Sequence, residues 1–318
     1  MALETFVAGV QLAHPIMNAA GTCRTVEDVR ELLQTPVAAV MVGSITMEPR
    51  TGNTGQTFWN GPNYSVNSLG LPNGGMPYYK DALPEMVRLV HGANTPIFAS
   101  VVGFTPQEYR ELAAFVLGCG VDRVELNLGC PNIWRGGVQK EIPCFNDMAV
   151  ADILAAVEHA IDDMVKVIVK LSPFSDLHNL EQVAAMLKRF SIVRAVTSCN
   201  TKPNVCEYDE NGKPLIGAYD AVGGHIISGG LSGQRLKPIS LPQVKTLRCA
   251  LPSYIKIIGV GGINSGQDVL DYIQAGAVVV QVGTALLQRG HGVFSQLLAE
   301  YIELAGPQKG FDWNAYRA

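Results

Sequence analysis

The sequence predicts an α/β fold, and within it a single (β/α)8 barrel, or TIM barrel, that spans residues 1–318. Short apolar runs rich in β-branched residues alternate with amphipathic stretches along the whole chain. Several of these runs are apolar on both faces, which is typical of parallel strands covered by helices. The alternation repeats eight times without a linker or a shift in composition, which indicates one domain. An open doubly wound sheet would show the same alternation, and the count of eight favours the barrel.

Each element is expected where the hydrophobic pattern places it. In chain order, the candidate strands are PIMNAA (15–20), VAAVMV (37–42), PIFASVV (96–102), VDRVELNL (121–128), VKVIVKL (165–171), IVRAVTSCN (192–200), IKIIGVGG (255–262) and AVVVQVG (277–283). The helical patterns between them cover residues 105–120, 148–161, 180–190, 265–276 and 293–306. Residues 43–75 and 201–233 interrupt the alternation and are expected to be insertions. Because both follow strands, we expect them on the C-terminal face of the barrel, where this fold carries its active sites.

Composition and charge restrict the class of protein. The apolar fraction of 47% and the charged fraction of 16% are those of a soluble globular protein. The net charge is −4 and no basic block occurs, which argues against nucleic acid as a partner. No apolar run approaches ~18 residues and the N-terminus does not resemble a signal peptide, so we expect a cytoplasmic protein without a membrane partner. The seven cysteines are scattered without a CxxC pair, which predicts neither disulfides nor a metal site.

Polar residues and glycines stand at the C-terminal ends of the candidate strands. They are Asn18, Ala19, Gly21, Gly43, Ser44, Ser100, Asn127, Cys130, Lys170, Asn200, Thr201, Gly261, Gly262, Gly283 and Thr284. A set of amides with one lysine and one cysteine is unsuited to metal binding. It suits a flat heterocycle that is bound through hydrogen bonds.

Glycines near the last two strands predict a phosphate site. The segments GVGGI (259–263) and VGTAL (282–286) allow backbone N–H groups to approach an anion, and Thr284 adds a hydroxyl. The segment GGLSG (229–233) offers a third set of amides. A lone glycine pair is weak support because loops are often rich in glycine, whereas the pairing of two adjacent strand ends is more specific.

Two side chains allow both a structural and a chemical interpretation. Lys170 ends an apolar strand, where it either extends out of the barrel rim or stands beside a cofactor that becomes anionic when reduced, such as a flavin. Cys130 lies between a glycine and a proline after a strand. It is either a small apolar residue of the strand end or a base or nucleophile directed at a ligand.

Six segments together resemble the class 1 dihydroorotate dehydrogenases, and most closely the soluble, homodimeric class 1A group that reduces fumarate. They are SVNSLGLPNGGMPYY (65–79), ELNLGCPN (125–132), VKLSPFSD (169–176), GGLSGQRLKP (229–238), IIGVGGINSGQD (257–268) and VQVGTAL (280–286). The resemblance is collinear over nearly the whole chain. It implies an FMN-dependent barrel enzyme, a homodimer, that oxidises dihydroorotate to orotate in pyrimidine biosynthesis.

The resemblance also implies a role for individual residues. Cys130 would be the general base that removes a proton from C5 of the dihydropyrimidine while C6 transfers hydride to flavin N5. The membrane-bound class has serine at this position. The implied substrate-binding residues are Asn67, Leu69, Gly70, Leu71, Asn127, Asn132, Asn200 and Thr201. The implied FMN-binding residues are Ala20, Gly21, Ser44, Asn127, Lys170, Gly230, Gly261, Gly262, Gly283 and Thr284.

One departure from the family pattern concerns the substrate. The family places a lysine before the serine at the end of strand 2, where it pairs with the substrate carboxylate, and this chain has Gly43. A carboxylate without that cation would lose ~1.5–3 kcal/mol of charge-assisted bonding. One hypothesis is that Arg135, in a loop that also departs from the family, replaces the cation, and its alternative is that Arg135 is solvated. A second hypothesis is a substrate without a carboxylate.

Four further interpretations remain open at this level. The first is an FMN-dependent dihydropyrimidine or ene reductase, and the second is a non-redox phosphate-binding barrel enzyme. The third is an FMN binder that lost its activity, although the retained Cys130 and Lys170 argue against decay. The fourth, a tRNA dihydrouridine synthase, is disfavoured by the charge balance and by the GLPN segment.

Overall fold

Eight parallel strands form the centre of the protein. The computed structural model describes residues 3–161 and 167–305. The strands are β3 (Ile16–Asn18), β4 (Val40–Ile45), β8 (Ile97–Val101), β9 (Arg123–Asn127), β12 (Val167–Lys170), β13 (Val193–Thr197), β18 (Lys256–Val260) and β19 (Val279–Val282). They are hydrogen-bonded in the order β3-β19-β18-β13-β12-β9-β8-β4. All eight predicted strands are confirmed, except that residues 165 and 166 of the fifth prediction lie outside the described residues.

The side chain of Asn18 connects the two ends of this strand order. Its Oδ1 accepts a hydrogen bond from the Met41 N–H at 2.8 Å, and its Nδ2 donates to the Met41 carbonyl at 2.9 Å. The N–H of Ala38, two residues before β4, donates to the Ile16 carbonyl of β3 at 3.0 Å, so the backbones also meet at this seam. The amide thus takes the place of ladder hydrogen bonds and completes the barrel, as the sequence predicted. Asn18 therefore serves the seam of the barrel and not the ligand.

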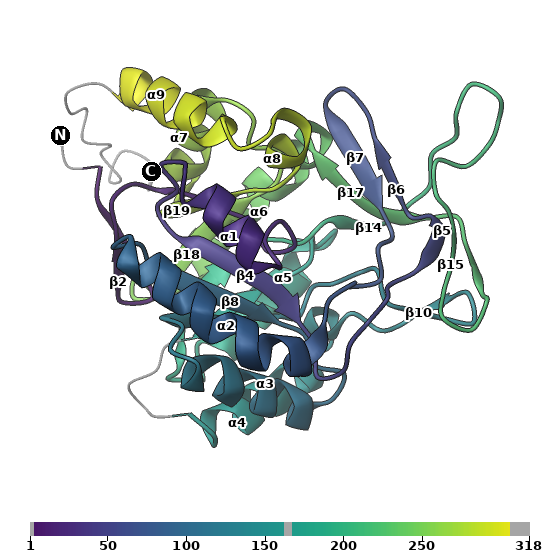
Figure 1. Cartoon of the computed structure of the whole chain (residues 1–318), viewed down its shortest axis with the longest axis horizontal. Helices are drawn as coiled ribbons and strands as arrows, with labels where there is room; N and C mark the ends of the chain where they lie inside the picture. The colour runs from purple at the N-terminus through teal and green to yellow at the C-terminus, as the bar shows by residue number, and fades with distance from the viewer. Residues whose placement is uncertain (1–2, 162–166, 306–318) are drawn as a thin grey trace.

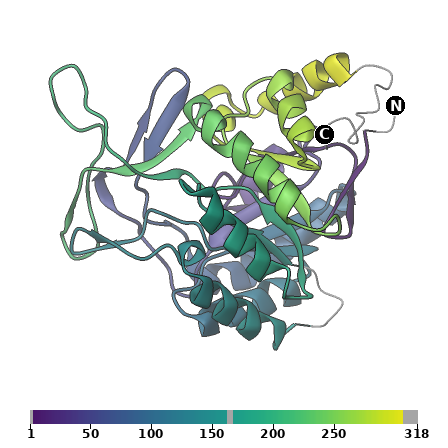
Figure 2. The same ribbon diagram turned by 180° about the vertical axis from the view of Figure 1, so that it is seen from behind.

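Helices surround the barrel on the outside (Figures 1 and 2). They are α1 (Val26–Leu32), α2 (Gly75–Gly92), α3 (Pro106–Gly118), α4 (Asp147–Glu158), α5 (Leu177–Leu187), α6 (Lys237–Ala250), α7 (Gly266–Ala275), α8 (Thr284–Arg289) and α9 (Val293–Ala305). Capping boxes begin two of them, at Thr25 with Asp28 and at Ser265 with Asp268. The helices cover strands such as β4 and β12, whose residues are all buried, which explains the apolar runs in the sequence.

The two predicted insertions form antiparallel sheets. The first contains β5 (Thr54–Gln56), β6 (Phe58–Asn60) and β7 (Tyr64–Asn67), and the second contains β14 (Lys202–Val205), β15 (Gly217–Tyr219), β16 (His225–Ile226) and β17 (Gly229–Gly233). Strand β7 pairs with β17, with Asn67 opposite Gly230, and β5 pairs with β15. Figures 1 and 2 show these strands together at one end of the molecule. A small apolar cluster holds them, which includes Tyr64, Val66 and Leu231.

Four short segments complete the structure. The hairpin of β1 (Thr5–Val7) and β2 (Val10–Leu12) precedes the barrel, and the hairpin of β10 (Trp134–Arg135) and β11 (Val138–Gln139) follows β9. Two 3-10 turns, η1 (Pro143–Phe145) and η2 (Gln234–Leu236), precede α4 and α6. In the part of the chain that the structure describes, no helix has both the length and the apolar character needed to cross a membrane.

Candidate active site

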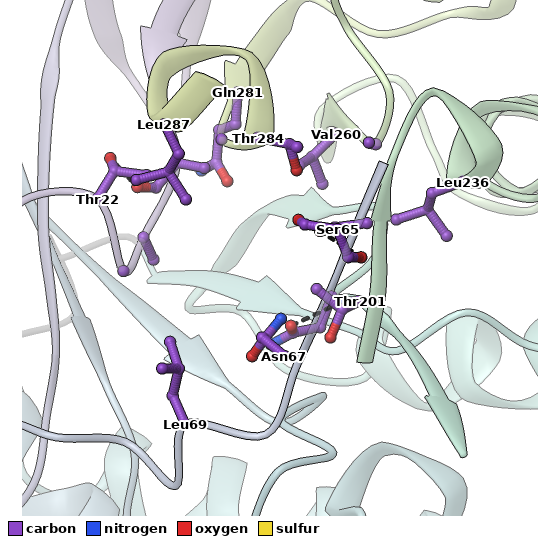
Figure 3. A pocket seen from close by; sticks show the side chains of 18 of the residues that line it. Thr22, Ser65, Asn67, Leu69, Thr201, Leu236, Val260, Gln281, Thr284 and Leu287 are labelled. Carbon is purple, nitrogen blue, oxygen red and sulfur yellow. Dashed lines mark hydrogen bonds between the residues drawn. The ribbon is translucent and has the colours of Figure 1, made fainter. Parts of the chain in front are cut away.

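A pocket opens where the barrel strands end and the inserted sheet begins. Every residue that the resemblance assigns to catalysis, substrate or FMN lines it except Gly230; of the other strand-end residues, Asn18, Gly43 and Ser100 do not. Those that line it are Ala20, Gly21, Ser44, Asn67, Leu69, Gly70, Leu71, Asn127, Cys130, Asn132, Lys170, Asn200, Thr201, Gly261, Gly262, Gly283 and Thr284. In Figure 3, Asn67 and Thr201 lie near each other, while Thr284 and Val260 lie at another end of the pocket. The fold thus brings together residues from all parts of the sequence.

One chain of polar side chains lies on the barrel side of the pocket. Asn200, which follows β13, donates to Asn127 Oδ1 at 3.2 Å, and Asn127 at the end of β9 donates to Ser44 Oγ at 3.0 Å. Ser44 in turn lies 3.0 Å from the hydroxyl of Ser100. These bonds orient the amides before any ligand binds, so their remaining polar atoms have defined directions.

A second chain of polar side chains connects the loop after β9 to the inserted sheet. Asn132 Nδ2 donates to Asn67 Oδ1 at 2.6 Å, and Asn67 Nδ2 donates to the carbonyl of Gly230 at 3.3 Å. Two buried oxygens here, Asn132 Oδ1 and Thr201 Oγ1, have no hydrogen-bond partner among the described residues. An unpaired buried oxygen is costly, and both of these line the pocket, so they fit a polar ligand bound between the two chains.

Cys130 is half-buried beside these amides. Burial raises the pKa of its thiol to about 11, while the backbone N–H of Asn132 and the positive charges of Arg50 and Lys170 oppose the rise. The two cations and the backbone N–H therefore keep the pKa of the Cys130 thiol below the value that burial alone would give. The side-chain amide of Asn132 donates to Asn67 Oδ1 and so connects this loop to the inserted sheet.

Lys170 points into the barrel and not out of its rim. It is 4% exposed, its Nζ lies 3.6 Å from Glu125 Oε1, and it donates to Gln281 Oε1 at 3.3 Å. Glu125 is fully buried, and its Oε2 accepts from Thr197 at 2.7 Å and from Gln281 at 3.1 Å. The interpretation of a lysine that extends out of the rim was therefore wrong. Separating a buried ion pair would leave an uncompensated charge, so the contacts with Glu125 and Gln281 fix the Lys170 ammonium at the floor of the pocket.

The glycines that follow β18 and β19, together with the last residue of β17, line the remaining end. A Cβ on Gly262 would lie 2.8 Å from the carbonyl oxygen of Gly233, so only glycine allows these loops to approach each other. Gly262 also has φ +75°, a left-handed conformation that favours glycine. Gly230 is absent from the lining but packs against a residue that belongs to it, because a Cβ on Gly230 would lie 1.9 Å from Thr201 Oγ1. Its neighbours Ser232 and Gly233 line the pocket in its place.

The positions of Gly43 and Arg135 bear on the missing lysine. Gly43 has φ +101°, and a Cβ on it would lie 2.4 Å from the carbonyl oxygen of Ser100 and 2.9 Å from the Ile45 nitrogen. The backbone here therefore accommodates no side chain. Arg135 is exposed in the β10–β11 hairpin and is absent from the pocket lining, which agrees with a solvated residue.

The sequence analysis missed several residues of the site. Among those that line the pocket are Arg24, Phe58, Ser65, Gln281 and Leu287. Gln281 could have been identified from the sequence, because it is an amide within the apolar run VVVQV. Glu125 gives the same kind of signal, because it is a charged residue within an apolar strand. Arg24 lies in a loop, Phe58 and Ser65 lie in short strands, and Leu287 lies in the short helix α8, so no periodic pattern marks the side that faces a ligand.

Comparisons with known proteins agree with this geometry. The family model described as dihydroorotate dehydrogenase matches residues 2–304. The chain is 31% identical over 312 residues to "Dihydroorotate dehydrogenase A (fumarate)" of Lactococcus lactis subsp. cremoris, which covers 97% of this chain and 96% of the relative. It is 33% identical over 304 residues to "Dihydroorotate dehydrogenase (fumarate)" of Trypanosoma cruzi, with coverages of 94% and 91%.

A solved structure supports the fold independently. The structure of DHODH from Eimeria tenella in complex with ferulenol matches with a TM-score of 0.80 over 95% of this chain and 84% of that chain, at 19% sequence identity. The barrel, the pocket and the matched family model therefore agree, and the chain belongs to the dihydroorotate dehydrogenase family of oxidoreductases.

Proposed function

We propose that this protein oxidises dihydroorotate to orotate for pyrimidine biosynthesis, with FMN as its cofactor and Cys130 as its general base. The observation that carries the proposal is the meeting of Asn67, Asn127, Asn132 and Asn200 around Cys130 in one pocket of a member of this family. Each amide supplies a donor and an acceptor, as the carbonyl and N–H groups of a pyrimidine ring require. The curated relatives carry names that specify dihydroorotate.

The pocket has the features that an FMN site needs. Lys170 holds a positive charge at the barrel floor, where it would stabilise the negative charge of a reduced isoalloxazine. The glycines near Gly262 and Gly283, together with Thr284, would bind the phosphate through N–H and hydroxyl donors. Thr201 Oγ1, buried and without a partner, supports a polar ligand nearby. FMN, when bound, supplies the acceptor for the hydride.

Cys130 would remove the proton of the reaction. The C5–H of dihydroorotate lies next to a ring carbonyl, so a positioned base contributes about 10²–10⁴-fold to the rate. The proton passes from C5 to the thiolate Sγ, while C6 loses hydride and a C5=C6 double bond forms. Arg50 and Lys170 lower the pKa of the thiol and thereby increase the fraction of Cys130 that can act. Asn132 contributes in the same direction through its backbone N–H.

Three further properties belong to the proposal. Fumarate is the expected acceptor because the names of the curated relatives specify it. A cytoplasmic homodimer and a single FMN-binding barrel domain over residues 1–318 follow from the resemblance and from the uninterrupted pattern of the sequence. The alternative, a reductase of dihydropyrimidines or enones without a carboxylate, rests on Gly43 alone and is less well supported than dihydroorotate.

The test is reduction of the bound flavin without oxygen. Purified protein loaded with FMN is mixed anaerobically with dihydroorotate or with dihydrouracil, and the absorbance of the oxidised flavin is followed. We expect rapid loss of the absorbance with dihydroorotate, reoxidation by fumarate, and a slow reaction in the Cys130→Ala variant. Reduction by dihydrouracil alone would contradict the proposal and support the alternative.

A further inference from the structure

The pocket lacks a side chain at the position where the family has its cation, and the surrounding backbone explains why. A Cβ on Gly43 would overlap the Ser100 carbonyl oxygen, so the cation cannot return at this position without moving the strand end. Dihydroorotate is nevertheless an anion through its carboxylate. A carboxylate held away from water without a cationic partner would bind poorly. The charge therefore has to come from elsewhere in the pocket lining.

Two cationic side chains line the pocket in the described part of the chain, Arg24 and Lys170. Lys170 is buried in the barrel and lies against the carboxylate of Glu125, so its charge is already partly neutralised. Arg24 forms no ion pair with any described residue. Its guanidinium group makes one described hydrogen bond, from Nη1 to the Pro72 carbonyl at 3.1 Å, and it retains its other donors. It is the available cation.

The location of Arg24 suits a replacement for the side chain missing at Gly43. The preceding residue, Cys23, accepts the Gly43 N–H at 2.9 Å, so Arg24 begins beside the position that lost its cation. The backbone of Arg24 is anchored, because its carbonyl accepts from the hydroxyl of the buried Tyr79 at 2.9 Å. The side chain then reaches Pro72, the residue that follows Leu69, Gly70 and Leu71 in the pocket wall.

The wall segment 69–72 is held in place from two sides. Arg50 Nε donates to the Gly70 carbonyl at 3.0 Å, and Arg24 Nη1 donates to the Pro72 carbonyl. Arg50 is absent from the pocket lining and lies against the ring of Phe104, so it supports the segment from behind. Arg24 lines the pocket itself. Of these two arginines, Arg24 is the one that belongs to the pocket lining, whereas Arg50 acts on Cys130 and on the Gly70 carbonyl.

From these contacts we infer that Arg24 binds the carboxylate of the substrate and replaces the cation absent at Gly43. This inference rests on the proposed function, because it assigns the anionic group of that substrate. The planar guanidinium group can donate two parallel hydrogen bonds to a carboxylate, which an ammonium group cannot. Arg24 thereby makes the pocket selective for a ring that carries an anion. Arg135, exposed in its hairpin, is the competing candidate.

The experiment measures the binding of orotate and of its neutral carboxamide to the FMN-loaded protein, from the change in the flavin spectrum. The variants are Arg24→Ala, Arg24→Gln and Arg24→Lys, with Arg135→Ala as the competitor and Arg30→Ala as the control for net charge. Arg30 is exposed on α1 and pairs with Glu27 and Glu85 away from the pocket. Arg24→Gln retains a donor for the Pro72 carbonyl and covers the case in which Arg24→Ala fails to fold.

We expect Arg24→Ala and Arg24→Gln to weaken orotate binding by about 10- to 100-fold, the usual effect of losing a hydrogen bond to a charged group. Binding of the carboxamide should change by less than about threefold, and Arg24→Lys should restore part of the affinity for orotate. Equal loss of affinity for both ligands would show that Arg24 only supports segment 69–72 and would overturn the inference. So would a large effect of Arg135→Ala with none from Arg24. Failure of the proposed function is distinct, because dihydroorotate would then leave the flavin of the unmodified protein oxidised.

Discussion

Proton removal by Cys130 should depend steeply on pH. Burial raises the pKa of the thiol to about 11, so at pH 8 about one thiol in a thousand is ionised. Because the thiolate is the base, the rate of flavin reduction should rise about tenfold for each pH unit between about 7 and 10. The raised pKa places the active, deprotonated form at high pH, and activity is lost as the pH falls.

Arg50 provides the perturbation, since its positive charge favours the thiolate and lowers the pKa of Cys130. Arg50→Ala should move the rate profile to higher pH and reduce the rate at pH 8 by about three- to tenfold. Arg50→Lys retains the charge and should restore most of the rate, although it loses the planar donor that contacts Gly70. Arg110→Ala, on the exposed face of α3, serves as the control for net charge.

The assay is anaerobic stopped-flow measurement of flavin reduction at saturating dihydroorotate from pH 6 to 10. Cys130→Ser should be slower than the unmodified enzyme by about 10²–10⁴-fold, the contribution of a positioned base. A rate profile that is flat above pH 6, or one with a midpoint below about pH 8, would refute the argument that burial determines the pKa of the Cys130 thiol. A shift of the Arg50→Ala profile to lower pH would refute the assigned sign of the charge effect.

The remaining predictions concern stability. Asn18→Leu leaves the Met41 N–H and carbonyl without partners in the barrel seam and should lower the free energy of unfolding by about 2–6 kcal/mol in urea titrations; a loss below about 1 kcal/mol would mean that the seam does not depend on this amide. Gly43→Lys should lower the thermal midpoint and fail to improve orotate binding, because its Cβ meets the Ser100 carbonyl oxygen; a stable variant with tighter binding would contradict the steric argument. Removal of FMN should lower the thermal midpoint. Addition of FMN at 100 times its Kd should raise the free energy of unfolding by about 2.7 kcal/mol. Riboflavin should stabilise less than FMN because it lacks the phosphate for the loops near Gly262, and equal stabilisation would exclude a phosphate site there.

The sequence by itself determined the eight strands of the barrel. All eight strands were identified because parallel strands covered by helices must be apolar on both faces, and this pattern is local. The residues at the strand ends were identified for a related reason, since parallel strands end on one face of a barrel. The strand-end residues of the candidate site, such as Cys130 and Asn127, therefore followed from the strand pattern, whereas Asn67 and Asn132 followed from the family resemblance.

The tertiary structure alone decided which side chains meet. Strands β7 and β17 are short and have no strong hydrophobic pattern. They form by pairing with each other, with Asn67 opposite Gly230, although the two segments are far apart in the sequence. Asn18 and Asn127 look alike in the sequence, yet one closes the barrel and the other lines the pocket. Such differences depend on the direction of a side chain, which a periodic pattern does not encode.

The charged residues of the site are visible in the sequence, but their contacts depend on the tertiary structure. Lys170 was visible in the sequence, but its burial against Glu125 depends on two strands that are neighbours only in the folded barrel. The absence of a side chain at Gly43 was equally visible, whereas the closeness of Arg24 to that position depends on the hydrogen bond between Gly43 and Cys23. The sequence therefore determined which charges the protein has. Electrostatic interactions act through space and fall off with distance, so only the folded structure decided where those charges act.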